Sequence, residues 1–283
     1  MNYDIIVIGS GPAGISAAIY AKRSNVNVVI ISKKDTTLYK ADKIDNYYGF
    51  ATTISGEELY ENGLKQAENL GIEIIEDEVV GINYDGNYSI DGINGSYTAK
   101  AVIMATGSKK AKTPIKGADD FLGKGLSYCA ICDGFFYRKK KVGVFGSGEY
   151  ALHEAKVLSN ICSEVIIYTN GENTNITEFT INSKKIVSLQ GEEKLEALVF
   201  EDGTKEELDG LFVAIGSAGT TDLALKLGAI VENNKVVINS KMETNMPGFY
   251  ACGDATGGLL QISKAVYEGS MAGLEASKFV KGK

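Results

Sequence analysis

The feature that most constrains the fold is a strand, a glycine turn and a helix in direct succession near the start of the chain. The run Asp4–Ile8 is apolar on both strand faces, as expected for a parallel strand between helix layers. It leads into the G-x-G-x-x-G turn GSGPAG at residues 9–14. In such a turn Gly9 permits the tight bend, Gly11 lets a pyrophosphate approach the backbone, and Gly14 lets the helix pack on the strand. The sequence therefore predicts a dinucleotide-binding fold here.

The second strand of this fold ends at Ser32, where an acidic side chain usually holds the adenosine ribose. Ser32 can accept one hydrogen bond, and Lys33 or Lys34 can approach a phosphate. The alternative for the two lysines is an exposed, solvated turn. The ribose contact of this strand is therefore in doubt.

The same order of elements recurs in the middle of the chain. A strand at 141–145 is followed by a second glycine turn at 146–151, a helix to about Ser159 and a strand at 164–168. A repeated order of elements indicates a repeated architecture, so a second dinucleotide fold is predicted. After Tyr168 the chain has neither the acid that binds a free 2′-hydroxyl nor the arginine that binds a 2′-phosphate. We expect the fold to be retained without the binding of a nicotinamide nucleotide.

The composition is that of an ordinary globular protein with room for two domains: 283 residues, 44% hydrophobic and 23% charged. The formal net charge of −7 gives no general affinity for nucleic acid or an anionic membrane. A buried strand is expected from Tyr3, so we expect no targeting segment, and no apolar run approaches the roughly 20 residues of a membrane span. We expect a cytoplasmic protein.

Two cysteines, Cys129 and Cys132, stand two residues apart and can close a small, easily reversed disulfide. In a C-x-x-C loop the first thiol is commonly exposed and its pKa depressed, which makes a thiolate available for disulfide exchange. The alternative is half of a zinc site, which would need two more ligands at matching spacing. The other cysteines, Cys162 and Cys252, are isolated, and the single histidine is His153. The sequence therefore favours a redox dithiol and predicts no metal.

Further segments complete an α/β pattern. Residues 55–58 match a capping box, which opens a helix to about Leu70. Buried strands at 101–107 and 211–216 each end in a glycine. Near the end of the chain Asp254 follows a strand and a glycine, where its carboxylate can accept hydrogen bonds from ligand hydroxyls or cap a helix.

Five segments together give the chain a resemblance to a known family. They are GSGPAG at 9–14, ATG at 105–107, SYCAICDGFFYR at 127–138, LFVAIG from 211 and PGFYACGD from 247. By these segments, which are spread along essentially the whole chain, the protein resembles the low-molecular-weight flavin thioredoxin reductases. The resemblance implies two Rossmann-like domains, the second inserted into the first. It places an FAD-binding domain at 1–111 and 217–283 and a redox domain at 112–216, and it implies thioredoxin as substrate and a homodimer.

The resemblance also implies roles for individual residues. Cys132 would face the flavin, Cys129 would attack the partner disulfide, and Asp133 would donate a proton. Asp254 and Gln261 would lie along the ribityl chain and the ring edge of the flavin. Taken with the glycine turn, the candidate cofactor-binding residues are Gly9, Gly11, Pro12, Ala13, Gly14, Ser32, Lys33, Asn46, Ala105, Thr106, Gly107, Gly253, Asp254, Gln261 and Ile262.

The chain departs from the family where NADPH should bind. The His-Arg-Arg signature that holds the NADPH phosphate is replaced by the Thr-Asn-Gly-Glu of 169–172. The arginine before the flavin-side glutamine is replaced by Leu260, in a segment that also looks shorter. Both departures are features of the ferredoxin-dependent flavin thioredoxin reductases of anaerobic clostridia, which this chain resembles.

Three hypotheses follow for the function. The favoured one is a ferredoxin-dependent thioredoxin reductase, and the others are an NADPH-dependent reductase with atypical contacts and a flavin-bearing redox sensor without turnover. Basic clusters at 138–141 and at Lys109, Lys110 and Lys112 can steer an acidic ferredoxin, or they are solvated turns.

Overall fold

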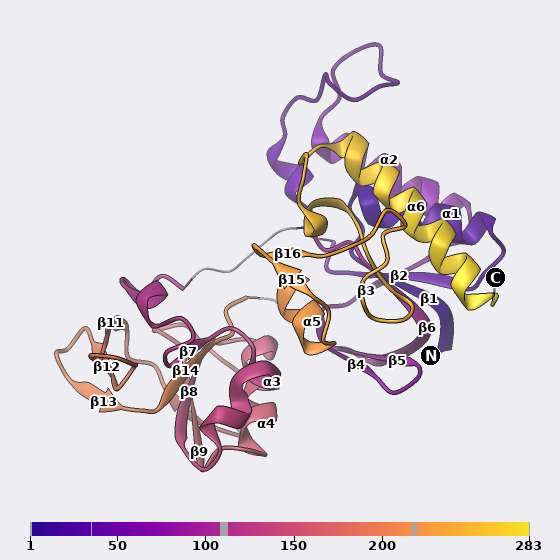
Figure 1. Ribbon diagram of the computed structural model, residues 1–283. Coiled ribbons are helices and arrows are strands. Elements are labelled where there is room, and N and C mark those ends of the chain that lie inside the picture. Colours follow the sequence, from indigo (N-terminus) through magenta and orange to yellow (C-terminus); the bar gives the residue numbers. More distant parts are fainter. Residues whose placement is uncertain (1, 35, 108–112, 217–219, 283) are drawn as a thin grey trace. The chain divides into compact units, whose positions relative to one another are not determined.

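The computed structural model describes residues 2–34, 36–107, 113–216 and 220–282. The chain forms two compact units: the first is Met1–Lys109 with Gly219–Lys283, and the second is Lys110–Ala218. Each unit is an α/β structure on a mainly parallel sheet (Figure 1), so the predicted fold class is confirmed. The predicted domain borders, 111/112 and 216/217, fall at residues 108–112 and 217–219, which lie outside the described residues.

The first unit is built on a seven-stranded sheet. Its strands are β1 Asn2–Ile8, β2 Val28–Ser32, β3 Glu73–Glu76, β4 Val79–Tyr84, β5 Tyr88–Gly92, β6 Ser96–Met104 and β17 Phe249–Ala251. The order is β3-β2-β1-β6-β5-β4, with β17 also paired to β6. Strands β3, β2, β1, β6 and β17 run parallel, whereas β4 and β5 form an antiparallel hairpin attached to β6. The carboxyl ends of the parallel strands therefore meet at one edge, where α/β folds bind ligands.

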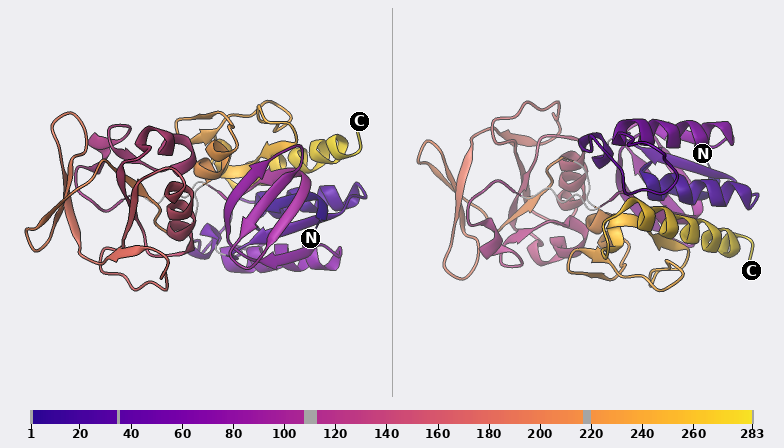
Figure 2. Two further views of the ribbon diagram at one scale, coloured as in Figure 1. Left: turned by 90° about the horizontal axis from the view of Figure 1, so that it is seen from below. Right: turned by 90° about the horizontal axis from the view of Figure 1, so that it is seen from above.

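Two helices of this unit pack unusually closely. The longer helices are α1 Pro12–Arg23, α2 Gly56–Asn69 and α6 Ile262–Val280. Helices α1 and α6 lie side by side (Figures 1 and 2). A Cβ at Gly269 or Gly273 of α6 would overlap the carbonyl oxygen of Ala13 or Ala17 of α1. The smaller elements are η1 Thr37–Lys40, α5 Thr220–Lys226, β15 Val231–Glu232, β16 Lys235–Val236 and η4 Gly253–Thr256.

The second unit has a five-stranded parallel sheet in the order β10-β9-β8-β14-β7. These strands are β7 Leu126–Ser127, β8 Lys141–Phe145, β9 Glu164–Tyr168, β10 Thr180–Asn182 and β14 Gly210–Val213. A smaller antiparallel sheet contains β11 Ile186–Gln190, β12 Ala197–Phe200 and β13 Lys205–Glu207. The helices are η2 Ala118–Phe121, α3 Ala130–Asp133, η3 Gly134–Tyr137 and α4 Glu149–Ser159.

Each face of the five-stranded sheet carries its own apolar core. Val142 and Val144 of β8 pack with residues of α3 and α4. Phe145, which points to the other face, packs with residues of the smaller antiparallel sheet. Because both faces are covered, the strands read as nearly continuous apolar runs.

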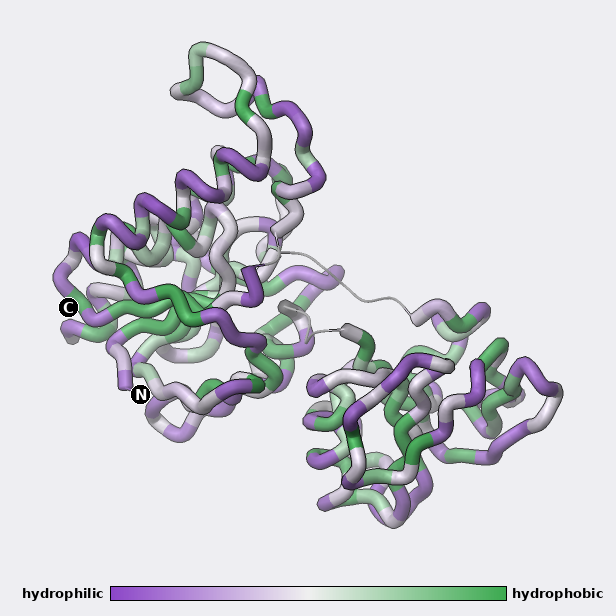
Figure 3. The backbone as a smooth tube through the Cα atoms, turned by 180° about the vertical axis from the view of Figure 1, so that it is seen from behind, coloured by the Kyte–Doolittle hydropathy of each residue, from purple (hydrophilic) through white to green (hydrophobic). Residues whose placement is uncertain are grey.

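Apolar segments follow the strands of both units (Figure 3). In the first unit the core joins side chains of β1, β2, β6, α1, α2 and α6 into one cluster. None of the helices in the described part of the chain could span a membrane.

Candidate active site

Glycine is required at each of the three positions of the first turn for a different structural reason. Gly9 has a φ of +104°, a backbone conformation that residues with a side chain rarely adopt. A Cβ at Gly14 would overlap the carbonyl oxygen of Gly9, whereas a Cβ at Gly11 would meet no protein atom within 4 Å. The turn is therefore closed on the protein side and open above Gly11.

The start of α1 fits the pyrophosphate of a dinucleotide. Gly11 is the N-cap residue and offers no side-chain cap, Pro12 opens the helix, and the first turn of α1 contains no acidic residue. A helix N-terminus carries partial positive charge and exposed N–H groups, which favour an anion. Open space and positive potential therefore coincide above Gly11.

The end of β6 lies beside this turn. Ala105 N–H donates to the carbonyl of Ile8 at 2.9 Å, and Cys252 N–H donates to the carbonyl of Met104 at 3.0 Å. Gly107 has a φ of +76°. The segment Ala105-Thr106-Gly107 and the segment Gly253-Asp254 thus follow neighbouring strands at the edge where β1 ends.

The structure places Ser32 in a local hydrogen-bond network. Its hydroxyl lies 2.7 Å from the Ser10 hydroxyl and accepts a hydrogen bond from Lys34 N–H at 3.0 Å. The ammonium group of Lys33 lies 2.7 Å from the Glu78 carboxylate. Both candidate ribose or phosphate contacts therefore already have protein partners.

Two further candidates are far apart in sequence and adjacent in space. The Asn46 Nδ2 group donates to Oε1 of Gln261 at 3.0 Å. Gln261 is the N-cap residue of α6, and Ile262 is its first residue. The exposed loop around Asn46 is thus fastened to the start of α6.

Lys264 and Glu268, on α6, fix the turn that contains Asp254, and the sequence prediction missed both. Glu268 Oε2 accepts hydrogen bonds from Gly253 N–H at 2.8 Å and from the Thr256 hydroxyl at 2.9 Å. Lys264 Nζ lies 3.0 Å from that oxygen and donates to the Gly253 carbonyl at 2.8 Å. Their i, i+4 spacing is an available signal, but the same spacing is common in exposed ion pairs.

The C-x-x-C motif of the second unit begins after β7 with Cys129 and continues into α3, which contains Cys132. The sequence predicts an exposed first thiol, and this is wrong for the structure: Cys129 is 4% exposed, and its sulfur is held in a disulfide. The side chain of Cys132 lies outside the part of the chain that the structure describes. Ser127 hydroxyl accepts a hydrogen bond from Cys129 N–H at 3.0 Å and donates to Oδ2 of Asp133 at 2.6 Å. The structure therefore brings the candidate Asp133 and the backbone of Cys129 to one buried hydroxyl.

A side chain of α4 forms a hydrogen bond with the backbone at the start of α3. Glu154, which is 2% exposed, accepts a hydrogen bond from Ala130 N–H at 2.9 Å. Its other carboxylate oxygen lies 3.3 Å from Nδ1 of His153. Burial, and then the negative charges of Asp133 and Asp209, raise the pKa of Tyr137. Helix α3 is thus partly buried and lies close to acidic side chains.

The second glycine turn keeps the Rossmann geometry. A Cβ at Gly146 would overlap the carbonyl oxygen of Ala214, whereas a Cβ at Gly148 would meet no atom within 4 Å. These contacts repeat those of the first turn. The chemistry differs, because Glu149 lies in the first turn of α4 and the Ser147 hydroxyl donates to the carboxylate of Glu172.

Of the residues that the structure describes, Lys141 and the two remaining cysteines do not join either site. Lys141 is paired with Glu206 at 3.0 Å, and Lys109, Lys110 and Lys112 lie outside the described residues. Burial raises the pKa of the free thiols Cys162 and Cys252, which makes them poor nucleophiles. No group of three or more metal-ligating side chains is present among the described residues.

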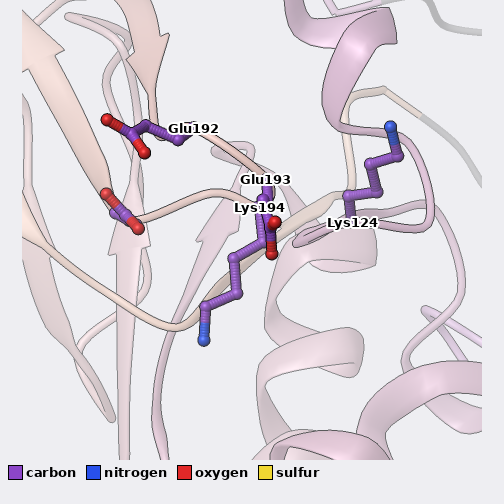
Figure 4. Close-up of a pocket in the computed structure, with 5 residues that line it drawn as sticks. Lys124, Glu192, Glu193 and Lys194 are labelled. Atoms are coloured by element: carbon purple, nitrogen blue, oxygen red, sulfur yellow. The ribbon is translucent and has the colours of Figure 1, made fainter.

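A surface pocket of about 360 Å³ lies in the second unit (Figure 4). It is lined by Lys124, Glu192, Glu193, Lys194 and Glu196. The lining is of mixed charge and contains none of the candidate residues, so it belongs to neither site.

A dinucleotide turn in one unit and a C-x-x-C motif on a second Rossmann-like unit define a flavin-dependent disulfide oxidoreductase. The family model described as pyridine nucleotide-disulphide oxidoreductase matches residues 3–269. A thioredoxin reductase of Treponema pallidum is 35% identical over 300 residues, covering 99% of this chain and 97% of the relative. The chain belongs to the pyridine nucleotide-disulphide oxidoreductase family and, within it, to the thioredoxin reductases.

Two solved structures are similar over nearly the whole chain. The atypical thioredoxin reductase TRi of Desulfovibrio vulgaris Hildenborough is 38% identical with a TM-score of 0.93, and the match covers 99% of both chains. A ferredoxin-flavin thioredoxin reductase of Clostridium acetobutylicum is 36% identical with a TM-score of 0.73, covering 100% of this chain and 99% of that one. FAD is the cofactor of this family, and the open space above Gly11 fits its pyrophosphate.

Proposed function

We propose that the protein reduces thioredoxin through the Cys129/Cys132 dithiol, with electrons that enter from reduced ferredoxin and not from NADPH. Bound FAD supplies the coupling between the two, because a flavin accepts electrons singly and delivers them as a pair. The observation that carries the choice of donor is the acidic second glycine turn, where Glu172 binds Ser147.

The pyrophosphate of a nicotinamide nucleotide needs positive potential at a glycine turn. In the second unit Glu149 and Glu172 place two carboxylates at this turn, and like charges repel. The first turn of α1, in contrast, contains no acidic residue. The two turns share a backbone geometry and differ in charge, which favours a dinucleotide at the first turn alone.

The energetics allow an iron–sulfur donor. A plant-type ferredoxin near about −400 mV lies roughly 130 mV below thioredoxin near about −270 mV. For two electrons the transfer is downhill by about 6 kcal/mol. The similarity to a protein described as a ferredoxin-flavin thioredoxin reductase supports the same donor.

The two cysteines have different proposed roles. The Cys129 thiolate attacks the thioredoxin disulfide, and the Cys132 thiol then resolves the mixed disulfide, so that two electrons and two protons pass to thioredoxin. Cys132→Ser should therefore trap a lasting mixed disulfide with thioredoxin, which a non-reducing gel detects. The matched variant Cys129→Ser should trap none, and the opposite pattern would reverse the two roles.

The decisive experiment supplies candidate donors to the purified, oxygen-free flavoprotein and follows the flavin absorbance. Reduced ferredoxin should bleach the flavin and support thioredoxin turnover, and millimolar NADPH or NADH should do neither. Rapid bleaching by NADPH with matching thioredoxin turnover would instead support an NADPH-dependent reductase with atypical contacts. Bleaching without thioredoxin turnover from any donor would support a redox sensor.

We also propose that the protein is a cytoplasmic homodimer. A dithiol that cycles between its two redox states suits a reducing compartment. The oligomeric state is tested by light scattering of the FAD-loaded protein, where the mass of a single chain would contradict the dimer.

A further inference from the structure

Ser127 ends β7 immediately before the redox loop, and it is only 3% exposed. Its hydroxyl oxygen accepts a hydrogen bond from Cys129 N–H at 3.0 Å. The same hydroxyl lies 2.6 Å from Oδ2 of Asp133. One buried hydroxyl therefore links the backbone of the first cysteine to the carboxylate that follows the second cysteine.

The direction of the second hydrogen bond follows from the chemistry of the two groups. A hydroxyl has one proton to donate, and the alternative acceptor, the Cys129 carbonyl, lies farther away at 3.3 Å. A bond to a carboxylate is charge-assisted and stronger than a bond to a neutral carbonyl. Asp133 N–H in turn donates to the Cys129 carbonyl at 3.1 Å. The helix thus holds the backbone of Asp133, and Ser127 holds its carboxylate.

We propose that Ser127 is a positioning residue, which orients the Asp133 carboxyl group for proton transfer during disulfide exchange. The inference rests on the proposed role of Asp133 as proton donor. In this step the Cys129 thiolate forms a bond to one sulfur of the substrate disulfide, and the substrate S–S bond breaks. The other substrate sulfur leaves with the electron pair and takes the proton from Asp133. The Ser127 hydroxyl then stabilises the carboxylate that remains.

Other ionisable groups surround Asp133 and bear on any pH dependence. Tyr137 lies on η3, and its pKa is raised by burial and then by the charges of Asp133 and Asp209. His153 and Glu154 lie on α4, which packs against α3. All of these groups stay unchanged when Ser127 alone is replaced. A difference between Ser127 variants therefore reports the hydroxyl and not its neighbours.

The matched variants are Ser127→Thr and Ser127→Val, which have nearly equal volume and differ in the hydroxyl group. The assay is the single-turnover reduction of oxidised thioredoxin by dithionite-reduced, FAD-loaded enzyme as a function of pH. Loss of a hydrogen bond to a carboxylate favours its protonated form, so the proton-donor limb of the Ser127→Val profile should move up by about one pH unit. Ser127→Thr should retain the wild-type limb, and Ser127→Ala should behave like Ser127→Val without added volume.

The Asp133→Asn background tests whether Ser127 acts through Asp133. In that background Ser127→Val should cause no shift of the pH profile. A shift that persists there, or a Ser127→Val rate that falls equally at every pH, would overturn the inference.

A second readout needs no partner protein, so it separates this inference from the proposed function. In holoenzyme labelled with ¹³C-aspartate, the NMR signal of Asp133 is identified by its loss in Asp133→Asn. That signal should titrate at higher pH in Ser127→Val than in Ser127→Thr, and equal titration in both would refute the positioning role. Failure of every variant and of the wild type to reduce thioredoxin would refute the proposed function alone.

Discussion

Replacing Gly11 by valine should strongly weaken FAD binding without unfolding the protein. Gly11 has a φ of −68° and a ψ of −179°, which any residue adopts, and a Cβ there meets no protein atom within 4 Å. The free energy of unfolding of the apoprotein should therefore change by no more than about 0.5 kcal/mol, as for a surface substitution. The added side chain fills the space through which a pyrophosphate approaches the turn.

The expected loss of affinity follows from the contacts that the pyrophosphate would give up. Moving it away from the start of α1 would remove hydrogen bonds from the exposed backbone N–H groups to charged oxygens, and about two such bonds are assumed here. Each such bond contributes about 1.5–3 kcal/mol, so the binding free energy should weaken by about 3–6 kcal/mol. The dissociation constant for FAD should rise by about 10²- to 10⁴-fold.

Gly14→Ala is the matched control within the same turn. Its Cβ would overlap the carbonyl oxygen of Gly9, so this variant should lose about 1–3 kcal/mol of apoprotein stability in addition to FAD. Urea unfolding of both apoproteins measures stability, and flavin fluorescence titration measures affinity. A Gly11→Val protein that binds FAD as tightly as the wild type would refute the placement of the pyrophosphate at this turn.

Two further predictions concern ion pairs of the first unit. Lys264→Met should cost about 3 kcal/mol of stability in urea unfolding, because Glu268 would remain buried without its cation. A larger loss of stability in Glu268→Gln than in Lys264→Met would contradict this prediction. The hydrogen bond from Lys100 lowers the pKa of Asp4 below its ordinary value of about 3.9. The pair therefore stabilises the fold above that pH, and this stabilisation is lost as the pH falls through the lowered pKa. Lys100→Met should cost about 0.5 kcal/mol at neutral pH and nothing in strong acid, and a difference that persists in acid would refute this assignment.

The local elements could be predicted from the amino-acid sequence, because they depend on neighbours within a few residues. Strand β8 and the end of α4 lie at the predicted residues 141–145 and Ser159. The Ser55 hydroxyl caps α2 by accepting a hydrogen bond from Glu58 N–H at 3.0 Å, as the capping box predicts. The C-x-x-C loop and both glycine turns could be identified from the sequence for the same reason, since each is a contiguous motif with a fixed backbone geometry.

Contacts between side chains that are distant in sequence could not be predicted, because burial and long-range pairing have no local signal. The pairing of Asn46 with Gln261 spans 215 positions in the sequence. Lys264 and Glu268 have the spacing of an ordinary exposed pair, and only the packing of α6 against the Gly253 turn makes them a buried support. Glu172 likewise reaches Ser147 only because parallel strands bring their carboxyl ends to one edge, where the charge of a turn is set by residues far away in sequence.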